Sequence, residues 1–216
     1  MTLTSLAHHA ERVAGIASRI ERPHRWVPIR TLHEWHRPKL RAHLLALDSA
    51  DRVLRFGHLV SDERMLSYAA QIDFGRDHVF GSFDRRLALV SMGHLAIDKS
   101  IGTGELGVSV LSRGRGRGLG SQLFDHAVTY ARNRGLHTLY LHVARENAPM
   151  LAIVQRAGAV IDFDGSEAVA AVPLAADTLG TQIEELLRHQ AAEFDYRVKL
   201  HSLRLELLPA GDPSKS

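Results

Sequence analysis

The residues whose types and spacing most clearly suggest chemistry are RGRGRGLG at positions 113–120, with three arginines and four glycines. They run directly into SQLFDHAVTYARNRG, whose apolar spacing predicts a helix. The first N–H groups of a helix lack partners within the helix and, together with the helix dipole, attract anions. Glycines let a ligand approach the backbone, and arginines offer forked donors to phosphate oxygens. The octet therefore predicts a site for a phosphate-bearing ligand.

Other phosphate-binding motifs fit this stretch poorly. The lysine and Ser/Thr of a P-loop are absent. A dinucleotide-binding loop follows the first strand of a βαβ unit and needs an acidic residue after the next strand, a role for which Glu146 is a poor match. A disordered Arg–Gly arm that binds RNA is a further alternative, but it would not adjoin so regular a helix. The formal net charge of +3 is also modest for a nucleic-acid-binding domain, so we expect no nucleic-acid partner.

The elements that would position this site follow from hydrophobic periodicity and turn residues. Leu119, Leu123, Phe124, Ala127, Val128 and Ala131 form one stripe of a helix that ends before Gly135. In chain order the sequence predicts a strand at 25–30, helices at 31–47 and 61–72, strands at 77–84, 85–97 and 105–112, a helix at 121–134, a strand at 136–143, a helix that begins after Asn147, and strands at 159–164 and 167–174. This order predicts a mixed α/β sheet.

The two ends of the chain differ from this central pattern. Residues 1–24 are at best weakly amphipathic and are predicted to form an N-terminal arm. The domain is expected to span residues 25–174, and residues 175–216 to form a helical extension and tail. A long, charged amphipathic helix is predicted at 181–207. Three roles for it stay open: packing on the sheet, covering a cleft, or pairing with a second copy of the chain in a homodimer.

Composition excludes several classes of site. The chain contains no cysteine, so disulfides, cysteine nucleophiles and thiolate metal sites are excluded, and a reducing cytoplasm is the expected location. No apolar run approaches membrane-spanning length, and the first residues lack the clean apolar stretch of a secretory signal. We therefore expect a cytoplasmic protein with no membrane partner, and no metal site.

The segment VLSRGRGRGLGSQLF resembles the acetyl-CoA loop of the GNAT-type N-acetyltransferases, whose pattern [RQ]-x-x-G-x-[GA] is matched by Arg115, Gly118 and Gly120. LHTLYLHVARENAPMLAIVQRAGAV resembles the fifth strand and the asparagine-started helix of the same family. The resemblance is specific over residues 105–163. It implies a GNAT-like α/β fold: a mixed, mostly antiparallel sheet flanked by helices, in which the fourth and fifth strands splay apart. The C-terminal helix is an addition to that fold.

The resemblance also implies a ligand, acetyl-CoA, as co-substrate. In this family the pantetheine arm lies in the gap between the splayed strands, against the exposed backbone of the fourth strand, here around Val108–Val110. Asn147 is a good N-cap residue, and the resemblance adds a hydrogen bond to the cofactor arm. The predicted cofactor-binding residues are Val108, Ser109, Val110, Arg113, Arg115, Gly116, Arg117, Gly118, Leu119, Gly120, Ser121 and Asn147. Within this set, Arg113 and Arg117 would steer the negatively charged cofactor or be solvated.

The implied activity is transfer of an acetyl or other acyl group to a primary amine by direct attack. The amine must lose a proton, the carbonyl must be polarised, and the leaving thiolate must be protonated. His142 is the predicted base, because Leu139, Leu141 and Val143 share one face of the strand and His142 lies on the other. Histidine is well suited to proton transfer near neutral pH. The alternative for His142 is a solvated or structural strand residue.

Two further side chains are weighed for the same chemistry. Glu105 opens the fourth strand and would relay a proton through water or bind a cationic substrate, or else be a solvated residue. His94 is a weaker candidate, because a histidine in an apolar strand is more often structural. The acceptor itself, a small-molecule or peptide amine, cannot be read from the sequence.

The leaving-group acid is where the chain departs from the family. Many members carry a tyrosine at the position of Val154, and valine cannot donate a proton. Tyr140 is a weak substitute, since tyrosine is also an ordinary strand residue. The absent tyrosine motivates an alternative function: a non-catalytic domain that binds or senses acyl-CoA.

Overall fold

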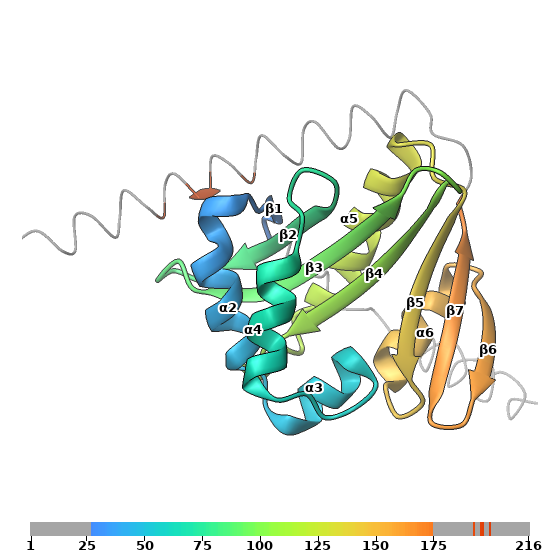
Figure 1. The fold of residues 1–216 in the computed structure, drawn as a ribbon, viewed down its shortest axis with the longest axis horizontal. Coiled ribbons are helices and arrows are strands. Elements are labelled where there is room, and N and C mark those ends of the chain that lie inside the picture. The colour runs from blue at the N-terminus through green and yellow to red at the C-terminus, as the bar shows by residue number, and fades with distance from the viewer. Residues whose placement is uncertain (1–26, 175–191, 193–194, 197–198, 200–216) are drawn as a thin grey trace, which may run out of the picture.

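The computed structural model describes residues 27–174, together with Ala192, Asp195, Tyr196 and Lys199. A seven-stranded sheet with the order β1-β2-β3-β4-β5-β7-β6 forms its centre (Figure 1). All neighbouring strands are antiparallel except β4 and β5. The strands are β1 (Arg30–Thr31), β2 (His78–Phe83), β3 (Leu89–Asp98), β4 (Thr103–Val110), β5 (Thr138–Ala144), β6 (Val160–Asp164) and β7 (Glu167–Pro173). The predicted mixed, mostly antiparallel sheet is confirmed.

Helices cover both faces of the sheet (Figure 1). One face carries α2 (Arg37–Leu45), α3 (Ser49–Phe56) and α4 (Asp62–Gln71), and the other carries α5 (Leu119–Asn133) and α6 (Ala148–Arg156). Two short 3₁₀ turns, Glu34–His36 and Ser112–Gly114, precede α2 and follow β4. Each face has its own hydrophobic cluster, centred on Leu40, Leu44 and Met65 beneath α2 and α4, and on Leu95, Leu123 and Leu139 beneath α5.

The structure differs from the predicted elements before β2. The predicted strand at 25–30 is limited to β1 at Arg30–Thr31, since Pro28 has no N–H to donate to a ladder. The sequence predicted two helices in this region, and the structure adds α3. The side chain of Asp48 caps α3 by accepting from the N–H of Asp51 at 2.8 Å, and Gly57 ends it. With only eight residues, α3 is too short for a strong periodic signal.

Strands β4 and β5 separate partway along their length, as predicted. They pair only from Thr103–Thr138 to Glu105–Tyr140. Beyond Glu105, β4 continues to pair with β3 as far as Val110, while β5 pairs with β7 as far as Ala144. This separation leaves one side of β4 without a neighbouring strand.

The free side of β4 presents peptide groups to the gap. The N–H of Leu111 donates to the carbonyl of Val90 at 3.0 Å, so Leu111 faces β3. Peptide groups point to alternate sides along a strand, so those of Val108 and Val110 point away from β3 and toward the gap. Buried peptide groups need hydrogen-bond partners, and a ligand in the gap would supply them.

Little of the predicted ends falls within the described residues. The predicted N-terminal arm lies outside them, as does the predicted helix at 181–207 apart from four residues. Among these four, the ring of Tyr196 lies 5.3 Å from that of Phe83 and 3.8 Å from the guanidinium carbon of Arg30. This part of the C-terminal segment therefore lies beside β1 and β2. None of the helices in the described part of the chain is long and apolar enough to span a membrane.

Candidate functional site

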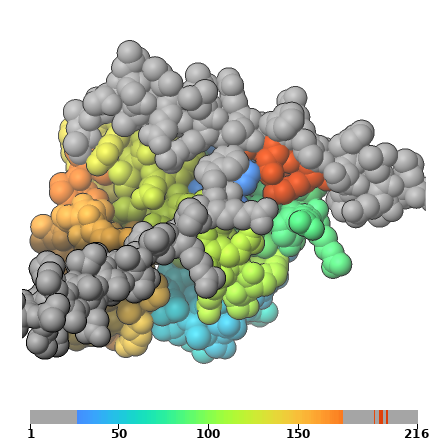
Figure 2. Space-filling model, turned by 180° about the vertical axis from the view of Figure 1, so that it is seen from behind, coloured from blue at the N-terminus to red at the C-terminus, as the bar shows by residue number. Residues whose placement is uncertain are grey.

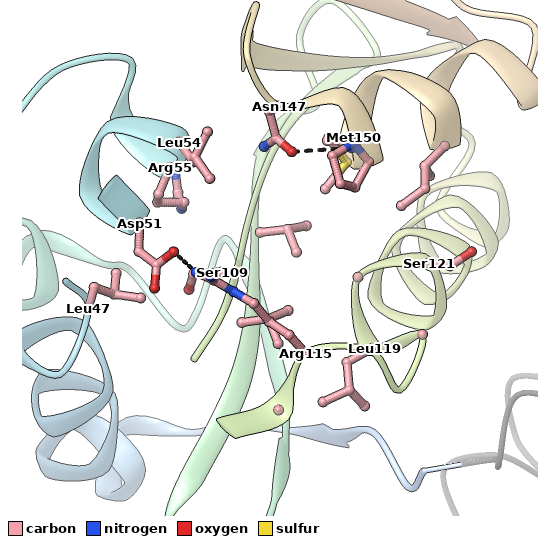
Figure 3. A pocket seen from close by; sticks show the side chains of 18 of the residues that line it. Leu47, Asp51, Leu54, Arg55, Ser109, Arg115, Leu119, Ser121, Asn147 and Met150 are labelled. Atoms are coloured by element: carbon pink, nitrogen blue, oxygen red, sulfur yellow. Dashed lines mark hydrogen bonds and ion pairs between the residues drawn. The ribbon is translucent and has the colours of Figure 1, made fainter. Parts of the chain in front are cut away.

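A cavity of about 580 Å³ lies along the end of β4 that β5 no longer pairs with, and we call it the gap cavity (Figure 3). Its walls come from the end of α2, from α3, from the end of β4, from the glycine–arginine loop and the start of α5, and from α6. On the molecular surface, α3 in cyan lies next to the light-green end of β4 and the loop that follows it (Figure 2). Segments far apart in the sequence thus converge on the unpaired side of β4.

All the predicted cofactor-binding residues except Arg113 and Arg117 line this cavity. The loop reaches α5 through Gly118, which is the N-cap of the helix and has φ 71°, a conformation that favours glycine. The first N–H groups of α5 have no partners within the helix, and Leu119, Gly120 and Ser121 lie on the cavity wall. This end of the cavity is therefore suited to an anion.

Arg115 is held at the cavity by an ion pair with Asp51 of α3. Asp51 is almost fully buried, whereas about half of the Arg115 side chain is exposed. Arg113 lies outside the lining, with its Nε 3.8 Å from Asp84 Oδ2, and Arg117 is exposed. Of the three arginines in the loop, Arg115 is thus the one on the cavity wall.

Asn147 begins α6 on the opposite wall. Its Oδ1 accepts from the N–H of Met150 at 3.2 Å, as an N-cap should. Its Nδ2 donates to no residue within the described part of the chain, and Figure 3 shows it directed toward the gap. Asn147 can therefore cap the helix and still donate to a ligand.

A second cavity, which we call the face cavity, has a volume of about 670 Å³ and lies where β4 and β5 are still paired. It brings together three side chains weighed from the sequence, Glu105, Tyr140 and His142. Glu105 and Tyr140 are direct partners across the two strands, and His142 is two residues further along β5 on the same face. Acidic, phenolic and imidazole groups thus share one cavity, beside the point where the gap opens.

Two other residues weighed from the sequence lie away from both cavities. Val154 is fully buried in the hydrophobic cluster beneath α5 and lines neither of them. His94 is held in a hydrogen-bonded chain between Tyr68 and Asp77. Within the described residues, no group of three or more His, Asp or Glu side chains could hold a metal ion.

A buried histidine fixes the side chain of Ser109 at the gap cavity. His43 Nδ1 lies 3.1 Å from the carbonyl of Leu89, and its Nε2 lies 2.8 Å from Ser109 Oγ. A carbonyl only accepts, so Nδ1 carries the proton and Nε2 accepts from the Ser109 hydroxyl. Burial lowers the pKa of His43 to about 4, against the opposing effect of the Leu89 carbonyl and with smaller help from Arg113 and Arg55.

This histidine predicts a loss of stability in mild acid. In the unfolded chain a histidine takes up its proton near its ordinary pKa of 6.5, whereas folded His43 does so only near pH 4. His43 therefore leaves the free energy of unfolding unchanged above pH 6.5. As the pH falls from 6.5 toward 4, His43 lowers the free energy of unfolding by on the order of 3 kcal/mol in total. Urea unfolding of the native protein and of His43→Gln at pH 7 and pH 4.5 measures this difference.

The His43→Gln variant should show a clearly smaller drop in unfolding free energy between these two pH values. His36, whose pKa is also lowered to about 4 by burial, stays in the variant and retains its own contribution. Exposed His137 provides the matched control, His137→Gln, which should keep the native pH dependence. An unchanged drop in His43→Gln would contradict the assignment.

Sequence reasoning missed the wall of the gap cavity that α3 provides. Asp51, Leu54 and Arg55 line the cavity from this helix, and Leu47 does so from the segment before it. A signal was present: Asp48 and Gly57 are a good N-cap residue and a good stop on either side of eight residues. A search for caps would have placed the helix where periodicity did not.

Comparison with known proteins supports the same fold. A model of the acetyltransferase (GNAT) family matches residues 29–159. No curated protein matches this chain. Among solved structures, the GNAT domain of S. lividans PAT is 16% identical with a TM-score of 0.57, covering 68% of this chain and 89% of that one.

Two further structures show the same similarity. The ribosomal-protein-S18-alanine N-acetyltransferase from Escherichia coli is 18% identical with a TM-score of 0.53, covering 70% of this chain and 96% of that one. A phosphinothricin acetyltransferase from Sinorhizobium meliloti, in complex with acetyl-CoA, is 14% identical with a TM-score of 0.53, covering 71% and 94%. At these identities the likeness shows the fold.

Proposed function

The chain belongs to the acetyltransferase (GNAT) family, and on that premise we propose that it transfers the acetyl group of acetyl-CoA to a primary amine by direct attack. The observation that carries the proposal is the gap cavity, where the peptide groups of β4 and the N-terminus of α5 line one continuous space. Residues 25–174 would form the transferase domain. The phosphinothricin acetyltransferase of similar fold has acetyl-CoA bound, which supports the choice of donor.

The residues of the gap cavity fit this donor by chemistry. A diphosphate is suited to the N–H groups at the start of α5 and to Arg115. The amides of the pantetheine arm can pair with the peptide groups of Val108 and Val110, and with the side-chain amide of Asn147. The donor would thus occupy the place along β4 that β5 vacates.

The acceptor amine is proposed to enter through the face cavity. His142 would take the proton from the attacking nitrogen, and Glu105 would attract the amine in its cationic form or relay the proton through water. The enzyme of similar fold from Escherichia coli acts on an alanine of ribosomal protein S18, so a peptide amine is one candidate acceptor, and a small-molecule amine is the other.

A turnover screen tests the proposal. Native protein is incubated with acetyl-CoA and mixed amine and peptide acceptors, and the release of free thiol is followed. Acceptor-dependent release supports acetyl transfer. If coenzyme A binds but no acceptor is turned over, the result would favour the alternative, a domain that binds or senses acyl-CoA. The buried Val154 at the usual acid position is the observation that motivates this alternative.

We expect Arg115→Ala to weaken coenzyme A binding about tenfold, because a hydrogen bond to a charged group contributes about 1.5 kcal/mol. Calorimetric titration with coenzyme A measures the affinity. Arg113→Ala removes a neighbouring arginine that is not on the cavity wall and should change the affinity less than about twofold at moderate salt. Equal losses in the two variants would show that the loop acts through its overall charge.

A further inference from the structure

Arg55 of α3 places its guanidinium group against the bare backbone of β4 at Gly107. A Cβ atom at Gly107 would lie 2.0 Å from Arg55 Cζ, so the guanidinium occupies the space where another side chain would begin. Gly107 is two residues beyond Glu105, the last residue of β4 that pairs with β5. Arg55 therefore lies where the gap opens, and it lines the gap cavity (Figure 3).

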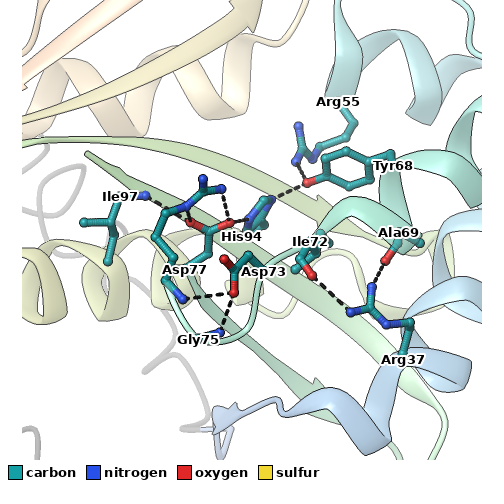
Figure 4. Close-up of polar contacts among 11 residues, drawn as sticks. Arg37, Arg55, Tyr68, Ala69, Ile72, Asp73, Gly75, Asp77, His94 and Ile97 are labelled. Atoms are coloured by element: carbon teal, nitrogen blue, oxygen red, sulfur yellow. Dashed lines mark hydrogen bonds and ion pairs between the residues drawn. The ribbon is translucent and has the colours of Figure 1, made fainter. Parts of the chain in front are cut away.

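A chain of hydrogen bonds holds Arg55 in this position (Figure 4). Arg55 Nη2 donates to Tyr68 Oη at 2.8 Å, and Tyr68 Oη lies 2.6 Å from His94 Nδ1. His94 Nε2 lies 3.1 Å from Asp77 Oδ2. A carboxylate only accepts, so His94 carries its proton on Nε2 and accepts the Tyr68 proton on Nδ1. Each of these three contacts thus joins one donor to one acceptor, from α3 through α4 to the middle of the sheet.

Among the hydrogen-bonded residues Arg55, Tyr68, His94 and Asp77, Arg55 is the positively charged one, and it lies on the side of the gap cavity. Burial raises the pKa of Tyr68 and lowers that of His94, so both are neutral near neutral pH. Burial alone would raise the pKa of Asp77, but hydrogen bonds from Arg76 and His94 outweigh it and hold that pKa below its usual value. Within the described residues Arg55 forms no ion pair with a carboxylate, in contrast to Arg115.

Resting on the proposed acetyl transfer, we infer that Arg55 stabilises the negative charge on the sulfur of coenzyme A as the thioester is cleaved. The amine nitrogen bonds to the carbonyl carbon, the C–S bond breaks, and its electron pair leaves on sulfur. The nitrogen proton goes to His142, and the thiolate later takes a proton from water. Arg55 stays protonated throughout, so it acts by charge and hydrogen bonding.

The surroundings favour the sulfur as the partner of Arg55. On α6, Val154 is buried in the core and offers no proton to the leaving group. The peptide N–H of Val108 points into the gap and remains available for the carbonyl oxygen. Of the other cations on the cavity wall, Arg115 is paired with Asp51 and Arg156 is at the far end of α6. Of the three arginines that line the gap cavity, Arg55 lies nearest to Glu105 along β4, because its guanidinium is at Gly107.

The direct test measures the ionisation of bound coenzyme A. The thiolate is followed by its ultraviolet absorbance while the pH is raised, with native protein and with Arg55→Met. The bound thiol should be half-ionised at least about one pH unit lower in the native protein, because a cation within a few ångström favours the charged form. Arg55→Lys keeps the charge and should retain most of the shift.

Turnover provides a second readout. Arg55→Met should lower kcat about a hundredfold, with the KM for acetyl-CoA within about threefold of native. Tyr68 is a positioning residue, so Tyr68→Phe should lower kcat about tenfold and lose part of the thiol shift. Tyr130, which stacks on His78 beneath the other face of the sheet, supplies the control Tyr130→Phe, with native values expected.

Each outcome decides the question. Calorimetric binding of coenzyme A shows that a variant is folded. If the thiol ionises at the same pH in native protein and Arg55→Met, or if Arg55→Lys behaves like Arg55→Met in both readouts, the role of Arg55 is overturned and acetyl transfer stands. If native protein binds no coenzyme A, both proposals fail.

Discussion

Replacing Gly118 by valine is expected to weaken coenzyme A binding about a thousandfold, or ~4 kcal/mol. Gly118 has φ 71° and ψ 15°, and a β-branched residue in this left-handed region is strained by about 1–3 kcal/mol. Relief of that strain would reorient the first turn of α5, whose N–H groups we propose to hold the diphosphate. The new side chain would also take space from the cavity wall. Calorimetric titration with coenzyme A measures the loss.

The matched control is Gly135→Val, at the other end of the same helix. Gly135 also has φ 71°, and a Cβ atom there would meet no other atom within 4 Å. Both variants should therefore unfold at lower temperature to a similar extent, while Gly135→Val keeps native affinity for coenzyme A. Native affinity in Gly118→Val, or an equal loss in both variants, would mean that the start of α5 is not the diphosphate site.

His142→Ala is expected to lower the turnover number about a thousandfold, within the range typical of a lost general base. His142 does not line the gap cavity, so the affinity for coenzyme A should stay within about twofold of native. Glu105 would still attract the amine, so the loss should appear mainly in kcat. Steady-state kinetics over a range of pH measures both quantities and shows whether the acidic limb of the rate profile disappears.

His137→Ala serves as the control, since His137 is an exposed histidine just before the same strand and lines neither cavity. It should keep native turnover and the native pH profile. A His142→Ala variant whose pH profile is unchanged would assign the base to another group. Glu105→Gln would then be the next variant to measure, because Glu105 shares the face cavity.

Elements with a long periodic pattern of apolar residues were predictable from the sequence. The helix predicted at 121–134 is α5 at Leu119–Asn133, because five residues of its apolar stripe are buried and Gly135 follows its end. The glycine–arginine loop was singled out for a related reason: its residue types are costly in ordinary structure, and the phosphate-bearing ligand that they indicate stays a prediction. Local patterns of this kind carry their own physical explanation.

The group around Arg55 could not be predicted, because it is assembled from four separate segments of the chain. Arg55 comes from α3, Tyr68 from α4, His94 from β3, and Asp77 from the residue before β2. Each is an ordinary residue in its own segment, and His94 was predicted to be a weak candidate for that reason. Only the packing of α3 and α4 on the sheet joins them (Figure 4).

The free side of β4 has a consequence for how the sequence of such a protein can evolve. What the strand offers there is main chain, and every residue type except proline carries the same donor and acceptor. A ligand that pairs with this main chain, as we propose for acetyl-CoA, would therefore still bind after many substitutions at positions 108 and 110. Selection would then act on the backbone conformation of this strand more than on its residue types, consistent with a fold shared at 14–18% identity.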